Sequence, residues 1–322
     1  MIETTTLMVR TAKLAAFGLS TEAYAKLTAS LLEFWRGLES EESRRGYAAD
    51  WRRYCTWLRS GGHSPLNATV AHVQAYLLDM QGRNLARATR ARALSVVRET
   101  YGALVRGGLL KDNPAREAKN IRVSKEPRTP WLTENELKRL IARPAKFTTW
   151  KSYRDWLIII TLVGTGLRRK EVAQLQIENL CLSPTGRPGC RVTVKGNKQG
   201  FILMPLWLYE HLWKWCRYLK RGRGPLFSSY QTAVQLRCVS PSTVRNIVKA
   251  AAARAGIDET RATPHAMRRT FITVTGERGA PLKDRQAALL HSHSSTTELY
   301  DKATGKTAPG DLLEDLVPRS KR

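Results

Sequence analysis

The sequence predicts a mainly α-helical protein of two domains, the second of which holds a small antiparallel sheet. Its 322 residues exceed what one hydrophobic core usually supports. Apolar residues recur at helical spacing over most of the chain, and residues 111–130, with three prolines, interrupt that pattern. The predicted boundaries are an N-terminal extension over 1–19, a helical domain over 20–112, a basic linker over 113–130, a second domain over 131–304 and a tail over 305–322.

Four helices are predicted in the first domain. Ser20 can cap the first one, and aromatic and leucine side chains between Tyr47 and Leu58 recur at helical spacing in the second. The third lies in TVAHVQAYLLDM, and the fourth, ATRARALSVVRETYGALVRGG, ends at a glycine pair. Arg87, Arg90 and Arg92 stand near the start of the fourth helix, either as a solvated face or as a surface laid against phosphate.

The second domain is predicted to open with a capped helix in TENELKRLIAR. KSYRDWLIIITLVGTG is an apolar helix that Gly164 and Gly166 interrupt, and RRKEVAQLQIENL continues helically. CRVTV and FILMPL predict two strands around the turn KGNKQG. Further helices are expected in LWLYEHLWKWCRYLKRG, STVRNIVKAAAARAG and PHAMRRTFITVTGERG, and another begins in LLHSHSSTTELYDKA.

A net charge of +27 indicates a polyanionic partner. Nucleic acid is favoured over membrane, because the longest apolar run, at 156–163, is far shorter than the ~20 residues that a span needs. Residues 1–110 carry 15 basic and 9 acidic side chains and residues 111–322 carry 39 and 18, so the second part holds most of the charge. We expect a protein of the bacterial cytoplasm or nucleoid.

Nothing in the composition predicts a cofactor or a bound metal. The five cysteines are scattered without a C-x-x-C pair, and the chain has neither a glycine-rich phosphate loop nor clustered acidic residues suited to Mg²⁺. The chemistry is therefore expected from side chains alone.

Two segments place arginines where the backbone can hold them against an anion. In GTGLRRKEV, Arg168 stands at the break after the apolar helix, and Glu171 can brace it; an ordinary helix end is the alternative. In TPHAMRRTF, His265 and Arg268 share one face of a helix near its N-terminus, which favours an anion. Arg269 is expected to face phosphate or solvent.

Two further segments supply groups that can move protons or attack. Lys195 precedes the Gly-Asn turn of VTVKGNKQG, and Lys198 follows it. LLHSHSSTTELYDKA contains His291 and Tyr300. A phosphodiester in transfer gathers negative charge that arginines and a histidine can hold. A tyrosine can attack it and conserve the bond energy in a phosphotyrosyl ester, while lysine or histidine protonates the leaving oxygen.

In their order and spacing these residues resemble the tyrosine recombinase (phage integrase) family, in its simpler Xer and Cre type. The resemblance lies in TGLRRKE, VKGNK, HAMR and HSHSSTTELY, and it extends over residues 20–115 and 131–322. It implies a four-helix, SAM-like core-binding domain and an α+β catalytic domain that form a C-shaped clamp around DNA.

The resemblance also implies a role for each group. Tyr300 would attack to give a 3′-phosphotyrosyl link without metal or ATP, and Lys195 would act as general acid. The phosphate would be held by Arg168, Arg268 and His291, with His265 assisting Tyr300 and Glu171 in support. Residues expected to contact DNA are Arg87, Arg90, Arg92, Lys198, Arg245 and Arg269.

The implied partners are double-stranded DNA with an inverted-repeat site and three further copies of the chain. Four protomers would join two duplexes through a Holliday junction, and an accessory DNA-bending protein is a further candidate partner. The tail is expected to dock on a neighbouring protomer, with packing on its own domain as the alternative. The biological outcome is open between integration or excision and dimer or cointegrate resolution. Alternatives are a type IB topoisomerase, a telomere resolvase, or an inactive architectural DNA-binding protein.

Overall fold

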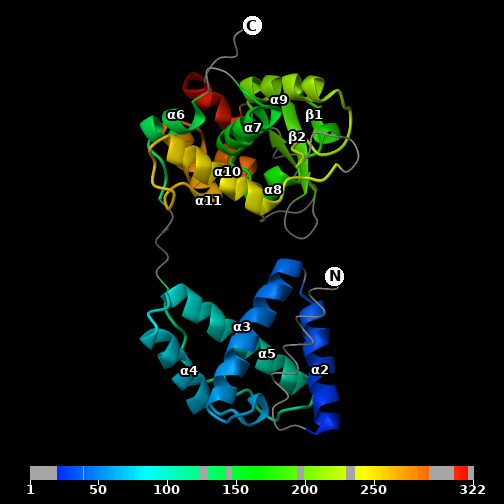
Figure 1. Ribbon diagram of the computed structural model, residues 1–322, viewed down its shortest axis with the longest axis vertical. Coiled ribbons are helices and arrows are strands. Elements are labelled where there is room, and N and C mark those ends of the chain that lie inside the picture. Colours follow the sequence, from blue (N-terminus) through cyan, green and yellow to red (C-terminus); the bar gives the residue numbers. More distant parts are fainter. Residues whose placement is uncertain are drawn as a thin grey trace. The chain divides into compact units, whose positions relative to one another are not determined.

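The chain divides between Glu126 and Pro127 into two compact units. The computed structural model describes residues 20–38, 40–123, 130–142, 147–193, 199–229, 236–289 and 308–317. Both units are predominantly helical, and the second contains a small antiparallel sheet (Figure 1).

Unit 1 contains the four helices that the sequence predicts. They are α2 (Thr21–Arg36), α3 (Glu41–Ser60), α4 (Val70–Gly82) and α5 (Arg87–Arg106). Ser20 caps α2 by accepting a hydrogen bond from the backbone N–H of Ala23 (3.3 Å), and the predicted glycine pair ends α5. Helix α5 packs against the other three helices, and it crosses α3 at the centre of the unit (Figure 1).

Aromatic side chains form the centre of the unit 1 core. Trp51 and Tyr54 of α3 contact Tyr101 of α5, with ring centroids 5.1 Å and 6.0 Å from that of Tyr101, and all three are fully buried. The Tyr101 hydroxyl donates to the carbonyl of Pro65 (3.0 Å), so its polar end is satisfied. The helical spacing in the sequence therefore identified the buried face of α3 correctly.

The segment after α5 belongs to unit 1, whereas the sequence predicts a linker from residue 113. Arg98 of α5 donates to the carbonyls of Ala115 (3.1 Å) and Ala118 (2.7 Å) and to the Asn120 side chain (2.8 Å). Both alanines are buried in the core. The Arg98 guanidinium thus donates hydrogen bonds to acceptors of a non-helical segment and fixes that segment to α5.

Unit 2 is built around one buried helix, α7. Its elements are α6 (Glu134–Ile141), α7 (Trp150–Thr165), α8 (Arg169–Ala173), the 3-10 turn η2 (Ile177–Asn179), β1 (Leu180–Leu182), β2 (Pro188–Thr193), β3 (Gln199–Leu203), α9 (Leu206–Leu219), α10 (Pro241–Arg254), α11 (Pro264–Glu277), α12 (Leu282–Ala288) and the 3-10 helix η4 (Pro309–Leu316). Helices α6, α8, α9, α10, α11 and η4 all pack on α7 (Figure 1). Within the described ranges no helix is long and apolar enough to span a bilayer.

Helix α7 ends at Gly166 and is not interrupted at Gly164, contrary to the expectation from sequence. Gly166 has φ +64°, the left-handed conformation that terminates helices. Gly164 lies inside the helix, where the Trp207 ring of α9 packs so closely that an added Cβ would come within 2.8 Å of that ring. The second glycine therefore ends the helix, and the first permits close packing.

The prediction of one continuous helix for RRKEVAQLQIENL is wrong. Helix α8 ends after five residues, and only the short 3-10 turn η2 follows it before β1. Between and at these elements the backbone pairs with a distant segment: the Ile177 N–H donates to the Gly224 carbonyl (2.9 Å), and the Leu226 N–H donates to the Leu175 carbonyl (2.9 Å). Strand β1 follows and joins β2 and β3 in a sheet of order β1-β2-β3, so tertiary pairing outweighs the local helical pattern.

Residues 308–317 pack on their own unit, and the docking of the tail on a neighbouring protomer stays a prediction. Leu313 and Leu316 are buried in the unit 2 core. Arg278, at the end of α11, forms ion pairs with Asp315 and Glu134, and its Nε donates to Glu134 at 2.6 Å. Gly310 lies against the end of α7, where an added Cβ would come within 2.1 Å of the Gly164 carbonyl oxygen.

Candidate active site

Arg168 stands at the junction of α7 and α8, where Glu171 fixes it. One Glu171 carboxylate oxygen accepts the backbone N–H of Arg168 (2.7 Å), and the other accepts Nη1 (2.8 Å). Glu171 is buried, whereas the Arg168 side chain is 48% exposed. The predicted contact is present, and it orients the guanidinium while leaving part of it open to a ligand.

Arg268 of α11 is buried and joins two chain segments. Its Nη1 donates to the carbonyl of Gly166 and its Nη2 to the carbonyl of Leu289, both at 2.8 Å. Only 5% of the residue is exposed. The carbonyl of Gly166 is in reach because Phe271, on the same helix, packs directly against that glycine.

The two arginines influence each other electrostatically. Burial lowers the pKa of Arg268, the positive charge of Arg168 lowers it further and Glu171 opposes the shift, so that the resulting pKa is about 10. Arg268 is still protonated at neutral pH. Two guanidinium groups and one carboxylate leave the site with excess positive charge, which a bound anion such as a phosphodiester would neutralise.

His265 lies in the first turn of α11, one turn before Arg268, as the sequence predicts. The helix begins at Pro264, and the Thr263 hydroxyl accepts the Ala266 N–H (3.1 Å). The His265 side chain is exposed, whereas the Arg268 side chain is buried. The start of α11 therefore exposes the His265 imidazole to solvent, one turn before the buried Arg268.

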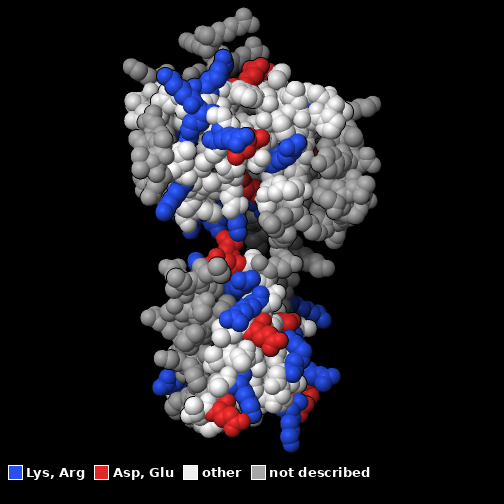
Figure 2. Space-filling view, turned by 90° about the vertical axis from the view of Figure 1, so that its right-hand side faces the viewer, with Lys and Arg blue, Asp and Glu red and all other residues white. Residues whose placement is uncertain are grey.

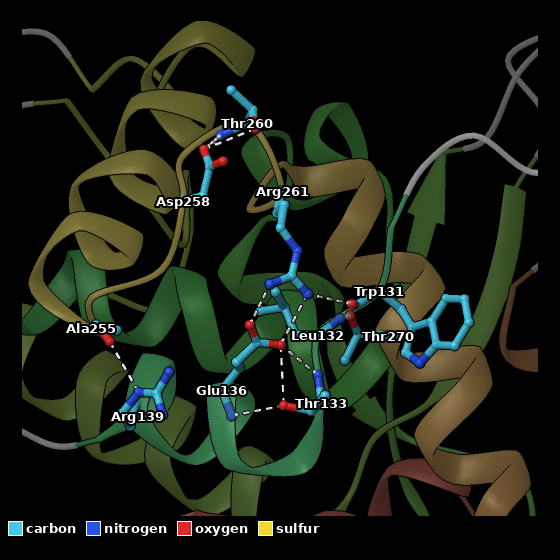
Figure 3. Close-up of polar contacts among 10 residues, drawn as sticks. All are labelled: Trp131, Leu132, Thr133, Glu136, Arg139, Ala255, Asp258, Thr260, Arg261 and Thr270. Carbon is cyan, nitrogen blue, oxygen red and sulfur yellow. Dashed lines mark hydrogen bonds and ion pairs between the residues drawn. The ribbon is translucent and has the colours of Figure 1, made fainter.

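A polar network fixes the loop that leads into α11 (Figure 3). Arg261 pairs with the Glu136 carboxylate of α6 through Nη1 (2.6 Å) and Nη2 (3.2 Å). The Thr133 N–H donates to Glu136 (2.9 Å), and these contacts lower the Glu136 pKa. Leu132 donates its N–H to the Thr270 hydroxyl of α11 (2.9 Å). These contacts hold α6, the loop before α11 and α11 together.

Four of the predicted site residues lie outside the described ranges. Lys195 and Lys198 fall in the chain between β2 and β3, and His291 and Tyr300 follow Leu289. Their roles stay predictions. Leu289 is the last described residue before His291, and its carbonyl accepts a hydrogen bond from Arg268.

The described tyrosines of the unit 1 core are poor candidates for a nucleophile. Burial raises the pKa of the Tyr54 and Tyr101 hydroxyls, and it raises that of Tyr76 to about 12. A phenol that is harder to ionise attacks less readily. Among the described residues, no group of three or more histidine, cysteine or acidic side chains is placed to hold a metal ion.

The predicted DNA-contacting arginines are distributed over both units. Arg87 and Arg245 are exposed on α5 and α10. Arg90 donates to Gln81, Arg92 pairs with buried Asp50 (2.6 Å), and Arg269 lies 4.8 Å from the centre of the Trp131 ring. Lys and Arg side chains cover parts of both units on the face shown in Figure 2. Trp131 and Asp50 were not among the predicted residues, because neither belongs to a recognisable sequence motif.

Two family models match most of the chain. The Phage integrase family matches residues 130–306, and the Phage integrase, N-terminal SAM-like domain, matches residues 31–108. "Tyrosine recombinase XerD" of Shewanella oneidensis is 30% identical over 285 residues, covering 85% of this chain and 90% of the relative.

Solved structures share the fold. The XerH site-specific recombinase in a post-cleavage complex with palindromic difH substrate has a TM-score of 0.67, at 17% identity and with 92% of each chain covered. A lambda integrase tetramer bound to a Holliday junction has a TM-score of 0.62, at 16% identity, with 87% of this chain and 79% of that chain covered.

The chain therefore belongs to the phage integrase family of tyrosine recombinases. Site-specific DNA recombination is the activity that this membership gives it, and the alternatives of a topoisomerase, a telomere resolvase or an inactive architectural protein are not favoured.

Proposed function

We propose that Arg168 and Arg268 bind the scissile phosphate of a recombination site. The carrying observation is the pair of guanidinium groups: one is buried and tied to two carbonyls, and the other is held half-exposed by Glu171. Charge that develops on the non-bridging oxygens would meet donors already in place, so little reorganisation is needed in the transition state.

The remaining chemistry is assigned to residues predicted from sequence. The Tyr300 hydroxyl attacks phosphorus, the bond to the 5′ oxygen breaks, and Lys195 supplies the proton to that oxygen. His265 accepts or shares the Tyr300 proton, and His291 donates a hydrogen bond to the phosphate. The phosphotyrosyl ester is then attacked by a 5′-hydroxyl of the partner strand, which returns the tyrosine unchanged without metal or ATP.

Assembly is proposed as a tetramer on two inverted-repeat sites, with each chain closing as a C-shaped clamp around DNA. The lambda integrase tetramer bound to a Holliday junction has the same fold and supports this arrangement. The reaction would serve integration and excision, or dimer and cointegrate resolution, in the cytoplasm or nucleoid, with an accessory DNA-bending protein as a further partner.

Covalent trapping tests the proposal. DNA selected by the protein from a random library is nicked near the predicted cleavage point, so that cleavage releases a short strand and the adduct accumulates. We expect the wild-type protein to form a denaturation-resistant adduct and Tyr300→Phe to form none. Tyr218→Phe, which changes an exposed tyrosine of α9, is the matched control. An adduct that persists in Tyr300→Phe would assign the nucleophile to another residue and overturn the proposal.

A further inference from the structure

Asp50 is a buried carboxylate that contacts two arginines of unit 1. The residue is 2% exposed and lies on α3 next to Trp51, within the core layer. Its Oδ1 accepts a hydrogen bond from Nη1 of Arg53 (2.7 Å), and its Oδ2 lies 2.6 Å from Nη2 of Arg92. Arg53 belongs to α3 and Arg92 to α5, so one carboxylate joins cations from two helices.

Folding stability does not account for this arrangement. Taking a carboxylate out of water carries a large desolvation penalty. The partners that should offset it, Arg53 and Arg92, have side chains that are 56% and 58% exposed, and ion pairs with such exposed partners are weak. A neutral side chain of similar shape would fit the core layer at lower cost, so Asp50 is better explained by what it does to the two arginines.

The two guanidinium groups keep most of their donors free. Each approaches Asp50 through a single nitrogen in the contacts above. Among the described residues, the Asp50 Oδ2 accepts no aligned hydrogen bond, so its short contact with Arg92 is electrostatic. Because both arginines touch one carboxylate, they are held within a few ångströms of each other, and more than half of each side chain is exposed to solvent.

The charge of this cluster suits one phosphate. Two cations and one anion sum to a single positive charge, which one phosphodiester group neutralises. Free arginines at this spacing would repel each other and lose much side-chain entropy on binding; Asp50 removes part of both penalties in advance.

We propose that Asp50 is a positioning residue that holds Arg53 and Arg92 as one binding site for a backbone phosphate of double-stranded DNA. The inference rests on the proposed function for its ligand, DNA. It reverses the usual electrostatic expectation, because the removal of this acidic residue should weaken the binding of DNA.

The test compares Asp50→Asn with Glu22→Gln in the whole chain carrying Tyr300→Phe, so that binding is not trapped covalently. Glu22 of α2 pairs with Lys26 at the surface (2.7 Å, 78% exposed) and gives the same change in charge. A fluorescent mixed-sequence duplex is the probe. We expect Asp50→Asn to raise Kd about five- to tenfold, and Glu22→Gln to leave Kd unchanged or lower it. Equal or tighter binding by Asp50→Asn overturns the proposal.

A second variant keeps the proposal testable if Asp50→Asn does not fold, as judged by circular dichroism. Arg92→Gln changes one exposed side chain and leaves Asp50 paired with Arg53, so this variant should retain the fold. We expect its slope of log Kd against log salt to decrease by about one relative to the parent. An unchanged slope would show that Arg92 does not meet a phosphate.

The adduct assay separates this inference from the proposed function. A wild-type protein that binds the duplex but forms no adduct on selected DNA overturns the recombinase chemistry and leaves the phosphate site intact. A wild-type protein that forms the adduct, with Asp50→Asn binding as tightly as its parent, overturns the phosphate site alone.

Discussion

Replacing Glu171 with glutamine should slow DNA cleavage without weakening DNA binding. The carboxylate accepts two hydrogen bonds from Arg168, one from the backbone N–H at 2.7 Å and one from Nη1 at 2.8 Å. Glutamine of the same shape has one oxygen, so one of the two donors would face an NH₂ group. The change also removes the negative charge that raises the pKa of Arg268, so that pKa should fall further below about 10.

The size of the effect follows from the lost contact. A hydrogen bond to a charged group contributes about 1.5–3 kcal/mol. If Arg168 loses that much alignment in the transition state, the cleavage rate falls about 10- to 150-fold. Affinity for DNA should stay equal or increase, because the variant carries one more net positive charge.

The assay is single-turnover cleavage of a nicked site at saturating protein, with affinity measured separately. Glu210→Gln is the control, because it makes the same charge change at an exposed position of α9. We expect Glu210→Gln to cleave at the wild-type rate. If Glu171→Gln cleaved as fast as Glu210→Gln, Glu171 would be a structural residue of α8 with no part in holding Arg168 for the reaction.

Three further outcomes are expected. Gly310→Ala should lower the free energy of unfolding by about 1–3 kcal/mol, because its Cβ would meet a backbone oxygen 2.1 Å away, whereas Gly222→Ala, with nothing within 4 Å, should melt like the wild type. Arg98→Ala should free residues 115–120, so that trypsin cuts this segment sooner; an unchanged cleavage rate would contradict the fastening described above. Glu134 and Asp315, which pair with Arg278, have lowered pKa values, so the stability that they contribute is full above their ordinary pKa values and is lost as pH falls through the lowered ones. Hydrogen exchange of residues 308–317, corrected for its intrinsic rate, should therefore rise in acid and not in mild base.

The helices were predictable because their ends and buried faces are written locally. Ser20 and the glycine pair after α5 mark helix ends within a few residues, and the spacing of Trp51 and Tyr54 marks the core. The short length of α8 was not predictable, because the segment after it pairs with residues about fifty positions away. Strand β1 was missed because its three residues follow a segment with a helical pattern and pair with β2. The predicted start of the linker at residue 113 differs from the structure for the same reason, because Arg98 of α5 binds residues 115–120, which lie well beyond that helix.

The candidate site divides along the same line. The Arg168 contact with Glu171 spans three residues and could be inferred from one motif. The burial of Arg268 and its bonds to Gly166 and Leu289 span 102 and 21 residues, so no local pattern indicates them. Asp50 was overlooked because an isolated acidic residue in a basic helix has the sequence appearance of a solvated one.

Arg268 has little freedom to be replaced even by another cation. Two of its nitrogens are committed to the carbonyls of Gly166 and Leu289, and only a branched planar group can serve both and still face a third partner. A lysine would carry the same charge, but its single ammonium could not bind the Gly166 carbonyl, the Leu289 carbonyl and a third partner at the same time. Sequence drift at this position should therefore be restricted by shape as much as by charge, and a library of substitutions selected for recombination should return arginine almost alone.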